Sequence, residues 1–152
     1  EIKCGAEILP ALEEIICPYD ARIVFVCCSI ETLALTKKRF PRSPALWNVS
    51  LSCGADGRWL PRGEDLVRRA REVGIDGLGL GFCEGVDGKI VRQIREGGLA
   101  LFVWTVDEMQ AAREMARLDV DYLATNRPGW LRDQVEPGQG PTAGTAPRPI
   151  RG

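Results

Sequence analysis

The sequence contains no histidine, and this excludes several kinds of catalytic site within the 152 residues. Ser29, which follows an apolar run, has no imidazole to activate it as a nucleophile. A zinc site is equally disfavoured, because the cysteines form no C-x-x-C pair. Their apolar surroundings instead predict reduced, mostly buried thiols, which favours a cytoplasmic location. The six cysteines are Cys4, Cys17, Cys27, Cys28, Cys53 and Cys83.

The chain also lacks a strong charge and a long apolar run. Its formal net charge of −1 provides no general attraction to nucleic acid or to an anionic membrane. No run approaches the roughly eighteen apolar residues of a transmembrane helix, and no secretory leader is visible. The first residue is Glu1 rather than methionine, which leaves open a start further upstream.

The chain is rich in apolar strands that alternate with amphipathic helices, most clearly from Leu99 to Pro128. The strand predicted at 99–103 is apolar on both faces, as in a parallel sheet covered by helices. Asp107 is the predicted N-cap of the next helix, and Glu108 adds negative charge to its first turn. A second apolar strand follows at 120–124. Trp104–Thr105 and Thr125–Asn126 would then share one rim of the sheet.

The same alternation extends over residues 1–135, which we predict to be one domain. Residues 50–62 have turn residues and no period, which predicts a loop. Residues 136–152 are rich in proline and glycine and predict a disordered tail. The remaining predicted strands are the end of one at 1–3, then 22–28, 45–49 and 75–82, and the remaining helices are 7–16, 29–40, 63–73, 86–96 and 130–135.

Two α/β architectures fit this alternation: an open doubly wound sheet and part of a (β/α)₈ TIM barrel. The doubly wound sheet often has G-x-G-x-x-G after its first strand, a pattern absent here. Gly77, Gly79 and Gly81 instead recur every second residue, so they share one strand face, which would leave room in a barrel interior. The glycine pattern therefore favours the barrel.

Glu1 and Lys3 are the first candidate site residues, because residues two apart on a strand point to the same side. At the carboxyl end of a barrel strand, the carboxylate would suit a divalent cation and the lysine a phosphate oxygen. The alternative is an exposed ion pair at a frayed terminus.

Three other features have two interpretations each. Trp104 is either a wall for an apolar part of a substrate or a core aromatic whose N–H finds a carbonyl. Thr125–Asn126 is either a helix-capping turn or a phosphate contact. The segment with Asp56, Arg58 and Trp59 is either a plain surface insertion or a specificity loop.

With these residues identified, the chain resembles the glycerophosphodiester phosphodiesterase family. The matching segments are Glu1-Ile2-Lys3, Cys28-Ser29 before a helix, FVWTVD at 102–107 and VDYLATNRP at 120–128. The resemblance implies an incomplete (β/α)₈ barrel in which this chain provides about six of the eight units. Three positions depart from the family: Ile30 replaces Phe, Asp119 replaces Gly, and Gly79 stands where a polar residue is common.

The resemblance also implies an activity, namely metal-dependent hydrolysis of glycerophosphodiesters to an alcohol and glycerol phosphate in lipid metabolism. Glu1 would bind a divalent metal ion, Mg²⁺ or Ca²⁺, Lys3 would contact phosphate, and Trp104 would form a cleft wall. The family's two catalytic histidines and two further metal-binding acids lie in the first two strand–loop units, which are absent here. We therefore expect no catalytic acid–base residue in this chain and an inactive fragment.

Two alternatives stay open at this point. One is a non-catalytic barrel remnant that binds a phosphorylated ligand or a partner chain, because an unpaired edge beside the first strand predicts self-association. The other is a different phosphate-handling barrel, similar to phosphatidylinositol-specific phospholipase C or to sphingomyelinase D.

Overall fold

The fold was analysed in a computed structural model that describes residues 1–16 and 23–134. Strands and helices alternate along the chain as the sequence predicts. A short 3₁₀ turn, Ala6–Ile8, precedes the first helix. The helices are α1 (Leu9–Ile16), α2 (Ile30–Arg39), α3 (Gly63–Val73), α4 (Gly88–Glu96), α5 (Met109–Arg117) and α6 (Pro128–Gln134). The strands of the main sheet are β1 (Phe25–Cys27), β2 (Ala45–Val49), β5 (Gly77–Gly81), β6 (Ala100–Trp104) and β7 (Tyr122–Leu123).

The five strands form one parallel sheet whose spatial order, β1-β2-β5-β6-β7, follows the chain. A doubly wound sheet reverses its strand order at a switch point, so this order identifies the barrel type of α/β fold. Ile2 extends the sheet beyond β1 by pairing in parallel with Cys27, and its N–H donates to Val26 O at 2.8 Å. The predicted strand end at 1–3 is therefore confirmed as an isolated bridge.

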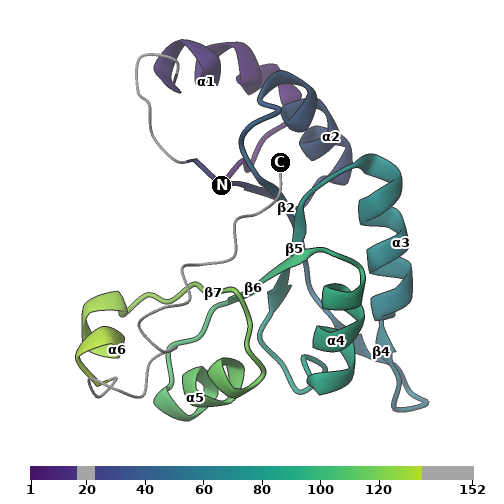
Figure 1. The fold of residues 1–152 in the computed structure, drawn as a ribbon, viewed down its shortest axis with the longest axis vertical. Helices are drawn as coiled ribbons and strands as arrows, with labels where there is room; N and C mark the ends of the chain where they lie inside the picture. Colours follow the sequence, from purple (N-terminus) through teal and green to yellow (C-terminus); the bar gives the residue numbers. More distant parts are fainter. Residues whose placement is uncertain (17–22, 135–152) are drawn as a thin grey trace.

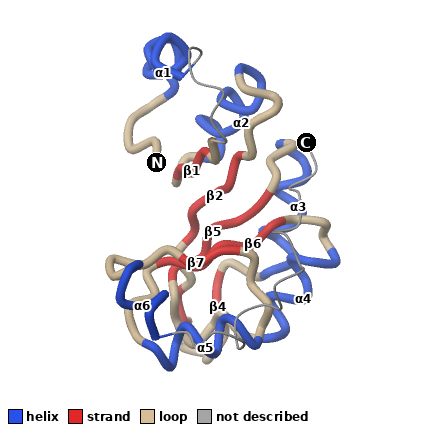
Figure 2. The backbone as a smooth tube through the Cα atoms, turned by 60° about the vertical axis from the view of Figure 1, so that its left-hand side comes forward, coloured by secondary structure: helices blue, strands red, loops and turns tan. Residues whose placement is uncertain are grey.

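The helices form an arc along one side of the sheet, and within the described residues the sheet does not close into a full barrel (Figure 1). The tube view in Figure 2 shows the strands running through the middle of the molecule, with α3, α4 and α5 outside them. The architecture is thus an incomplete barrel, open at β1 and at β7. None of the described helices has the length and apolar character needed to cross a membrane.

The core lies between the sheet and the helical arc. Leu78 and Leu80 of β5 are fully buried on the outer face, together with Leu101 and Val103 of β6. Burying one such side chain contributes about 2 kcal/mol to folding. The helices supply the opposite half of this core, with buried residues that include Leu33, Leu66, Ile94 and Met115.

Two aspartates fix the amino ends of the strands. Asp76, just before β5, accepts a hydrogen bond from Ala45 N at 2.8 Å, and its other oxygen lies 2.9 Å from Lys37 Nζ. The Asp76 and Lys37 side chains are only 8% and 18% exposed. Asp121, just before β7, accepts from Leu101 N at 2.8 Å in the same way. Each carboxylate joins the start of its own strand to the start of the neighbouring strand, β5 to β2 and β7 to β6. These bonds fix the register between the two strands of each pair.

The segment 50–62 is a β-hairpin rather than the predicted loop. β3 (Ser52–Cys53) pairs antiparallel with β4 (Trp59–Leu60). Gly57 makes the turn possible because its backbone is left-handed, with φ at 74°, and its N–H donates to Gly54 O at 3.0 Å. Strands of two residues are too short to show an alternating pattern in the sequence.

The prediction of mostly buried thiols is wrong. All described cysteines are free, but only Cys27 is buried; Cys4, Cys28 and Cys53 are exposed. Cys4 and Cys53 lie in the turn and hairpin regions, where apolar neighbours in sequence do not become neighbours in the core. Cys17 and the predicted tail, 136–152, lie outside the described residues.

The predicted N-cap at Asp107 is also wrong, because α5 begins one residue later, after Glu108. The Asp107 carboxylate instead accepts three hydrogen bonds across the sheet: from Thr125 Oγ1 at 2.9 Å, from Asn126 N at 2.7 Å and from Asn126 Nδ2 at 2.8 Å. The Asn126 backbone N–H is the main cause of the lowered pKa of Asp107, followed by the Asn126 and Thr125 side chains. Asp107 therefore joins the β6–α5 and β7–α6 connections.

Asp76→Ala should destabilise the chain by about 2 kcal/mol, because it leaves the partly buried Lys37 ammonium without its anion and Ala45 N without its acceptor. The urea midpoint at unchanged m-value measures this loss. Glu72→Ala, which removes the exposed partner of Arg68 at 3.4 Å, is the matched control and should leave the midpoint unchanged. Equal effects of the two substitutions would contradict the assigned role of Asp76.

Exchanging the side chains of Asp107 and Asn126 should preserve the bridge that either single change weakens. Asp107→Asn replaces the charged acceptor by a neutral amide, and Asn126→Asp sets two carboxylates against each other, so both should lower the melting temperature. In the double variant the amide oxygen at position 107 still accepts from Thr125 and from the backbone N–H of residue 126, while the amide nitrogen donates to the new carboxylate. The melting temperature should therefore recover, and additive losses would contradict this geometry.

The bridge also has a predicted pH dependence. Because folding lowers the pKa of Asp107, its contribution is complete at neutral pH and is lost as the pH falls below about 4, through the folded-state pKa. The Asp107→Asn variant should lack this component of acid destabilisation, measured as the melting temperature against pH.

Candidate functional site

A cleft of about 450 Å³ lies on the inner face of the sheet, opposite the helical arc. Alternate residues of the strands point into it, as the two-residue period of a strand requires. β5 contributes no side chain there, because its inner positions are glycines. The lining residues are Glu1, Val24, Val26, Leu46, Asn48, Phe102, Trp104, Thr105, Tyr122 and Ala124.

The glycines of β5 determine how these side chains are arranged. Gly79 pairs with Asn48 on one side and Phe102 on the other, and a Cβ at Gly79 would overlap both the Asn48 Oδ1 atom and the Phe102 ring. The space predicted above the glycine face is thus partly filled by side chains from β2 and β6. The Asn48 carboxamide occupies the space over Gly79.

Glu1 and Lys3 point to the same side, with Ile2 between them buried on the outer face. Their charged groups form an ion pair in which Lys3 Nζ is 3.3 Å from Glu1 Oε2. Glu1 lines the cleft and is 43% exposed, whereas Lys3 is 79% exposed and does not line it. The structure therefore brings Glu1 and Trp104 together in one cleft and places Lys3 beside it.

Trp104 ends β6 and covers Gly81, where a Cβ would lie 3.6 Å from the Trp104 ring. Its Nε1 is buried and has no hydrogen-bond partner among the described residues. The structure therefore does not support the interpretation of Trp104 as a core aromatic whose indole N–H donates to a carbonyl. Thr105 beside it is exposed at the rim.

Asn48 is the cleft residue that the sequence analysis missed. It is 7% exposed, and its Oδ1 is the second buried side-chain atom without a partner in the described part of the chain. The available signal was a single amide within the otherwise apolar strand ALWNV. A buried polar group without a bond is costly, so such a residue suggests a ligand or an ordered water.

Thr125 and Asn126 lie at the same rim as Trp104 and Thr105, as predicted, since Val106 N donates to Ala124 O at 2.8 Å. They make a turn in which Thr125 Oγ1 accepts from Arg127 N at 3.1 Å, and they do not line the cleft. This supports a structural turn rather than a phosphate contact at these two residues.

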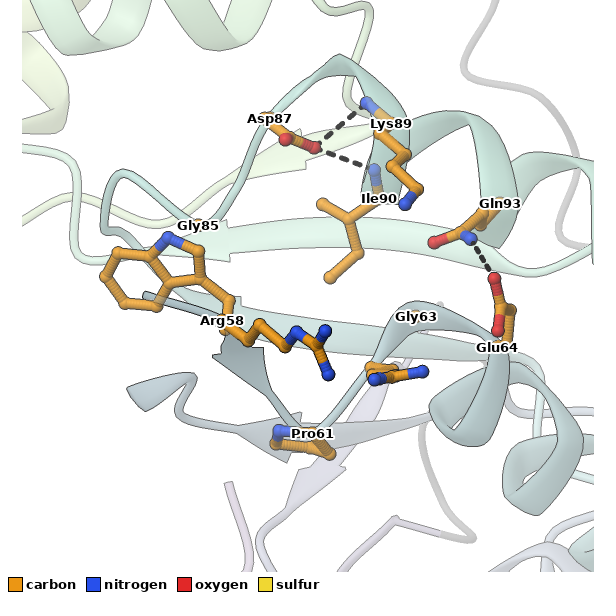
Figure 3. Close-up of a pocket in the computed structure, with 11 residues that line it drawn as sticks. Arg58, Pro61, Gly63, Glu64, Gly85, Asp87, Lys89, Ile90 and Gln93 are labelled. Carbon is orange, nitrogen blue, oxygen red and sulfur yellow. Dashed lines mark hydrogen bonds between the residues drawn. The ribbon is translucent and has the colours of Figure 1, made fainter. Parts of the chain in front are cut away.

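A second pocket, of about 420 Å³, lies between the amino ends of α3 and α4 (Figure 3). Arg58 and Trp59 of the hairpin line it, whereas Asp56 does not. Several of its polar side chains are already bonded: Asp87 caps α4 by accepting from Lys89 N and Ile90 N at 2.9 Å, and Gln93 donates to Glu64 at 2.8 Å. This pocket has no unpartnered buried group among the described residues.

The described residues do not form a complete metal site. Glu1 is the one carboxylate that lines the inner cleft, and no cluster of three or more His, Cys, Asp or Glu residues that could hold an ion occurs in the described ranges. Mg²⁺ and Ca²⁺ need about six or more oxygen ligands, several of them from carboxylates or water. Glu1 can supply one such ligand and no more.

Comparisons with solved structures show the same fold in known phosphodiesterases. A candidate glycerophosphoryl diester phosphodiesterase from Silicibacter pomeroyi superposes with a TM-score of 0.70 at 22% identity, over 84% of this chain and 43% of its own. A phosphodiesterase from Oleispira antarctica, in complex with the product sn-glycerol-3-phosphate, gives 0.67 at 18% identity, over 84% and 49%. A glycerophosphodiester phosphodiesterase from Thermotoga maritima gives 0.62 at 17%, over 85% and 54%.

The chain thus spans about half the length of these relatives. Among proteins with curated functions, none matches the chain. The sequence profile of the glycerophosphoryl diester phosphodiesterase family, however, matches residues 4–130, which include the hairpin, the cleft strands β1 to β7 and the rim turn. On this match, together with the barrel-type sheet, the chain belongs to the glycerophosphoryl diester phosphodiesterase family.

Proposed function

We propose that this chain forms the substrate-binding part of a barrel that hydrolyses glycerophosphodiesters to an alcohol and glycerol 3-phosphate, a reaction of lipid metabolism. The observation that supports this most directly is the inner cleft, which both Glu1, next to the Ile2 bridge, and Trp104, at the carboxyl end of β6, line. Active sites of (β/α)₈ barrels are built at this end of the strands. The bound glycerol-3-phosphate of the Oleispira antarctica relative adds support for the substrate class.

In this proposal the charged and aromatic residues of the cleft have separate roles. Glu1 would provide one ligand to Mg²⁺ or Ca²⁺, and the remaining ligands would come from outside the described residues. Such an ion would supply Lewis-acid chemistry at the phosphoryl group. Lys3, held beside Glu1 at 3.3 Å, contacts a phosphate oxygen, and Trp104 forms a wall against the organic part of the substrate.

The inner cleft offers no histidine for proton transfer, and its titratable side chains among the described residues are Glu1 and Tyr122. Hydrolysis of a phosphodiester requires a base for the attacking nucleophile and an acid for the leaving alcohol. The 152 residues include no histidine, and Glu1 is engaged by Lys3. We therefore infer that histidines outside the 152 residues complete the site and that the chain alone is inactive.

The purified 152 residues should not hydrolyse glycerophosphocholine above background with Mg²⁺ or Ca²⁺. If the coding DNA upstream of Glu1 contains an in-frame His-Arg-Gly after an apolar strand, then Glu-x-Asp and His-Asp, the extended protein should be active. In that protein Glu1→Gln should lower kcat by more than about 100-fold, because an amide is a poor ligand for these cations. Release of choline measures both rates.

Lys38→Gln on the exposed surface of α2 is the matched control and should leave the rate unchanged. Rapid hydrolysis by the 152 residues alone would contradict the need for external histidines. An upstream stop codon would instead favour the second candidate function.

That second candidate is a non-catalytic barrel remnant that binds a phosphorylated ligand or a partner chain. The observation in its favour is the open sheet: beyond β1 only Ile2 is paired, and β7 pairs with β6 alone among the described strands. Val24, which lines the inner cleft beside β1, is 44% exposed. Unpaired strand edges beside apolar side chains favour association.

Under this candidate the 152 residues should self-associate in a concentration-dependent manner, and Val24→Lys should shift the equilibrium toward monomer. Sedimentation velocity over a wide range of concentrations measures the effect. Leu35→Lys, at an exposed apolar residue of α2 on the other side of the sheet, is the control. A stable monomer at every concentration would exclude the remnant that pairs with itself.

We also propose a cytoplasmic location. It is supported by the cysteines of the described residues, which are free and in three cases exposed. Such thiols persist where the surroundings are reducing.

A further inference from the structure

Two buried polar atoms of the inner cleft lack a partner among the described residues, and they are of opposite type. The Oδ1 atom of Asn48 only accepts hydrogen bonds, and the Nε1–H of Trp104 only donates. Both residues line the same cleft, and Asn48 is more than nine-tenths buried. A ligand that satisfies both must offer a donor and an acceptor.

The chemistry of the pair disfavours simple ions. In the orientation that the structure has, a phosphate oxygen would face the acceptor Asn48 Oδ1 unfavourably, and an ammonium group has no lone pair for Trp104 Nε1–H. A hydroxyl group offers both a proton and lone pairs. The walls next to the pair are the Phe102 and Tyr122 rings, which are neighbours across β6 and β7 and suit the C–H groups of a polyol.

The two side chains lie over different glycines of β5. Asn48 Oδ1 lies over Gly79, and the benzene edge of the Trp104 ring lies over Gly81. These glycines are two residues apart on β5, about 6–7 Å along the strand. Because the two side chains occupy neighbouring places on the cleft floor, two hydroxyl groups on adjacent carbons can each make one of the two bonds.

We propose that Asn48 and Trp104 bind the two neighbouring hydroxyl groups of a glycerol moiety, a role that rests on the proposed function. One hydroxyl donates to Asn48 Oδ1, and the other accepts from Trp104 Nε1–H. Both protein atoms are covered in the free chain, so binding turns the Asn48 carboxamide toward the cleft, a motion that the soft χ2 angle of asparagine permits. Asn48 and Trp104 thus select the alcohol part of the substrate rather than its phosphate.

The test is a titration of the 152-residue chain followed by NMR, using the Trp104 indole N–H signal and the backbone amide of residue 48. The probes are glycerol 3-phosphate, 3-hydroxypropyl phosphate, which lacks the middle hydroxyl, inorganic phosphate and glycerol. Trp104→Phe assigns the indole signal by its loss. We expect glycerol 3-phosphate to shift this signal and to bind about 5–10-fold more tightly than 3-hydroxypropyl phosphate.

Asn48→Leu keeps the size of the side chain and removes the acceptor. This variant should bind glycerol 3-phosphate more weakly by a similar factor, and its affinity for 3-hydroxypropyl phosphate should be unchanged. Asn48→Asp keeps an acceptor oxygen and should retain the preference for glycerol 3-phosphate over 3-hydroxypropyl phosphate. Gln93→Leu removes a carboxamide from the second pocket and should change nothing. If Asn48→Leu does not fold, Trp104→Phe removes the donor alone and should abolish the same preference in the backbone-amide titration.

The outcomes separate this inference from the proposed function. Tight binding of glycerol 3-phosphate that is unaffected at Asn48 and Trp104 would overturn the hydroxyl site and leave the substrate class intact. Binding of glycerol that depends on Asn48, with no gain from a phosphate group, would support the hydroxyl site and count against the phosphodiester substrate. No shift of the Trp104 signal with any probe would overturn the hydroxyl site.

Discussion

The inner face of β5 has no side chains, and the shape of the cleft depends on this. Gly77 and Gly79 pair with residues of β2 on one side, and Gly77, Gly79 and Gly81 all pair with residues of β6 on the other. The inward side chains of those strands therefore lie over the central strand instead of standing apart from one another. A Cβ at Gly79 would overlap Asn48 and Phe102, so even alanine would displace the cleft floor. The same strand anchors the outer core through Leu78 and Leu80, which lets one short segment serve both faces.

Three aspartates hold the sheet around this strand. Asp76 and Asp121 accept backbone N–H groups at the amino ends, and Asp107 accepts three hydrogen bonds at the carboxyl ends. A carboxylate suits these positions because it is short and only accepts, so it satisfies donors that a parallel ladder leaves free at its ends. The rim near Trp104 is consequently fixed from the side of β7, and the cleft wall does not depend on α5 or α6 packing alone.

The sequence was sufficient for the order and type of the elements, since strands that are apolar on both faces and helices with one apolar stripe have distinct periods. It was not sufficient for features that arise from pairing between distant segments. The placement of Glu1 in the cleft depends on the Ile2–Cys27 bridge, and the role of Asp107 depends on Asn126, nineteen residues away. Asn48 was missed because one amide in an apolar strand does not reveal which face it occupies or that it lacks a partner. The hairpin was missed because its strands are too short to show a period.

The distribution of charge within the cleft suggests how its parts divide the work. Glu1 and Lys3 lie at the edge of the sheet next to β1, on either side of the paired residue Ile2. The cleft floor around Asn48, Phe102 and Trp104 is neutral. Under the proposed function, the phosphate of a substrate would face the charged edge, and its alcohol part would lie over the neutral floor. That edge is also where the sheet is open and where further strands of a barrel would add. Catalytic groups on such strands would therefore approach the phosphate directly, while the substrate is held by residues of this chain. On the proposed function, binding of the substrate would thus rest on residues of this chain, and proton transfer on groups that approach from the open edge.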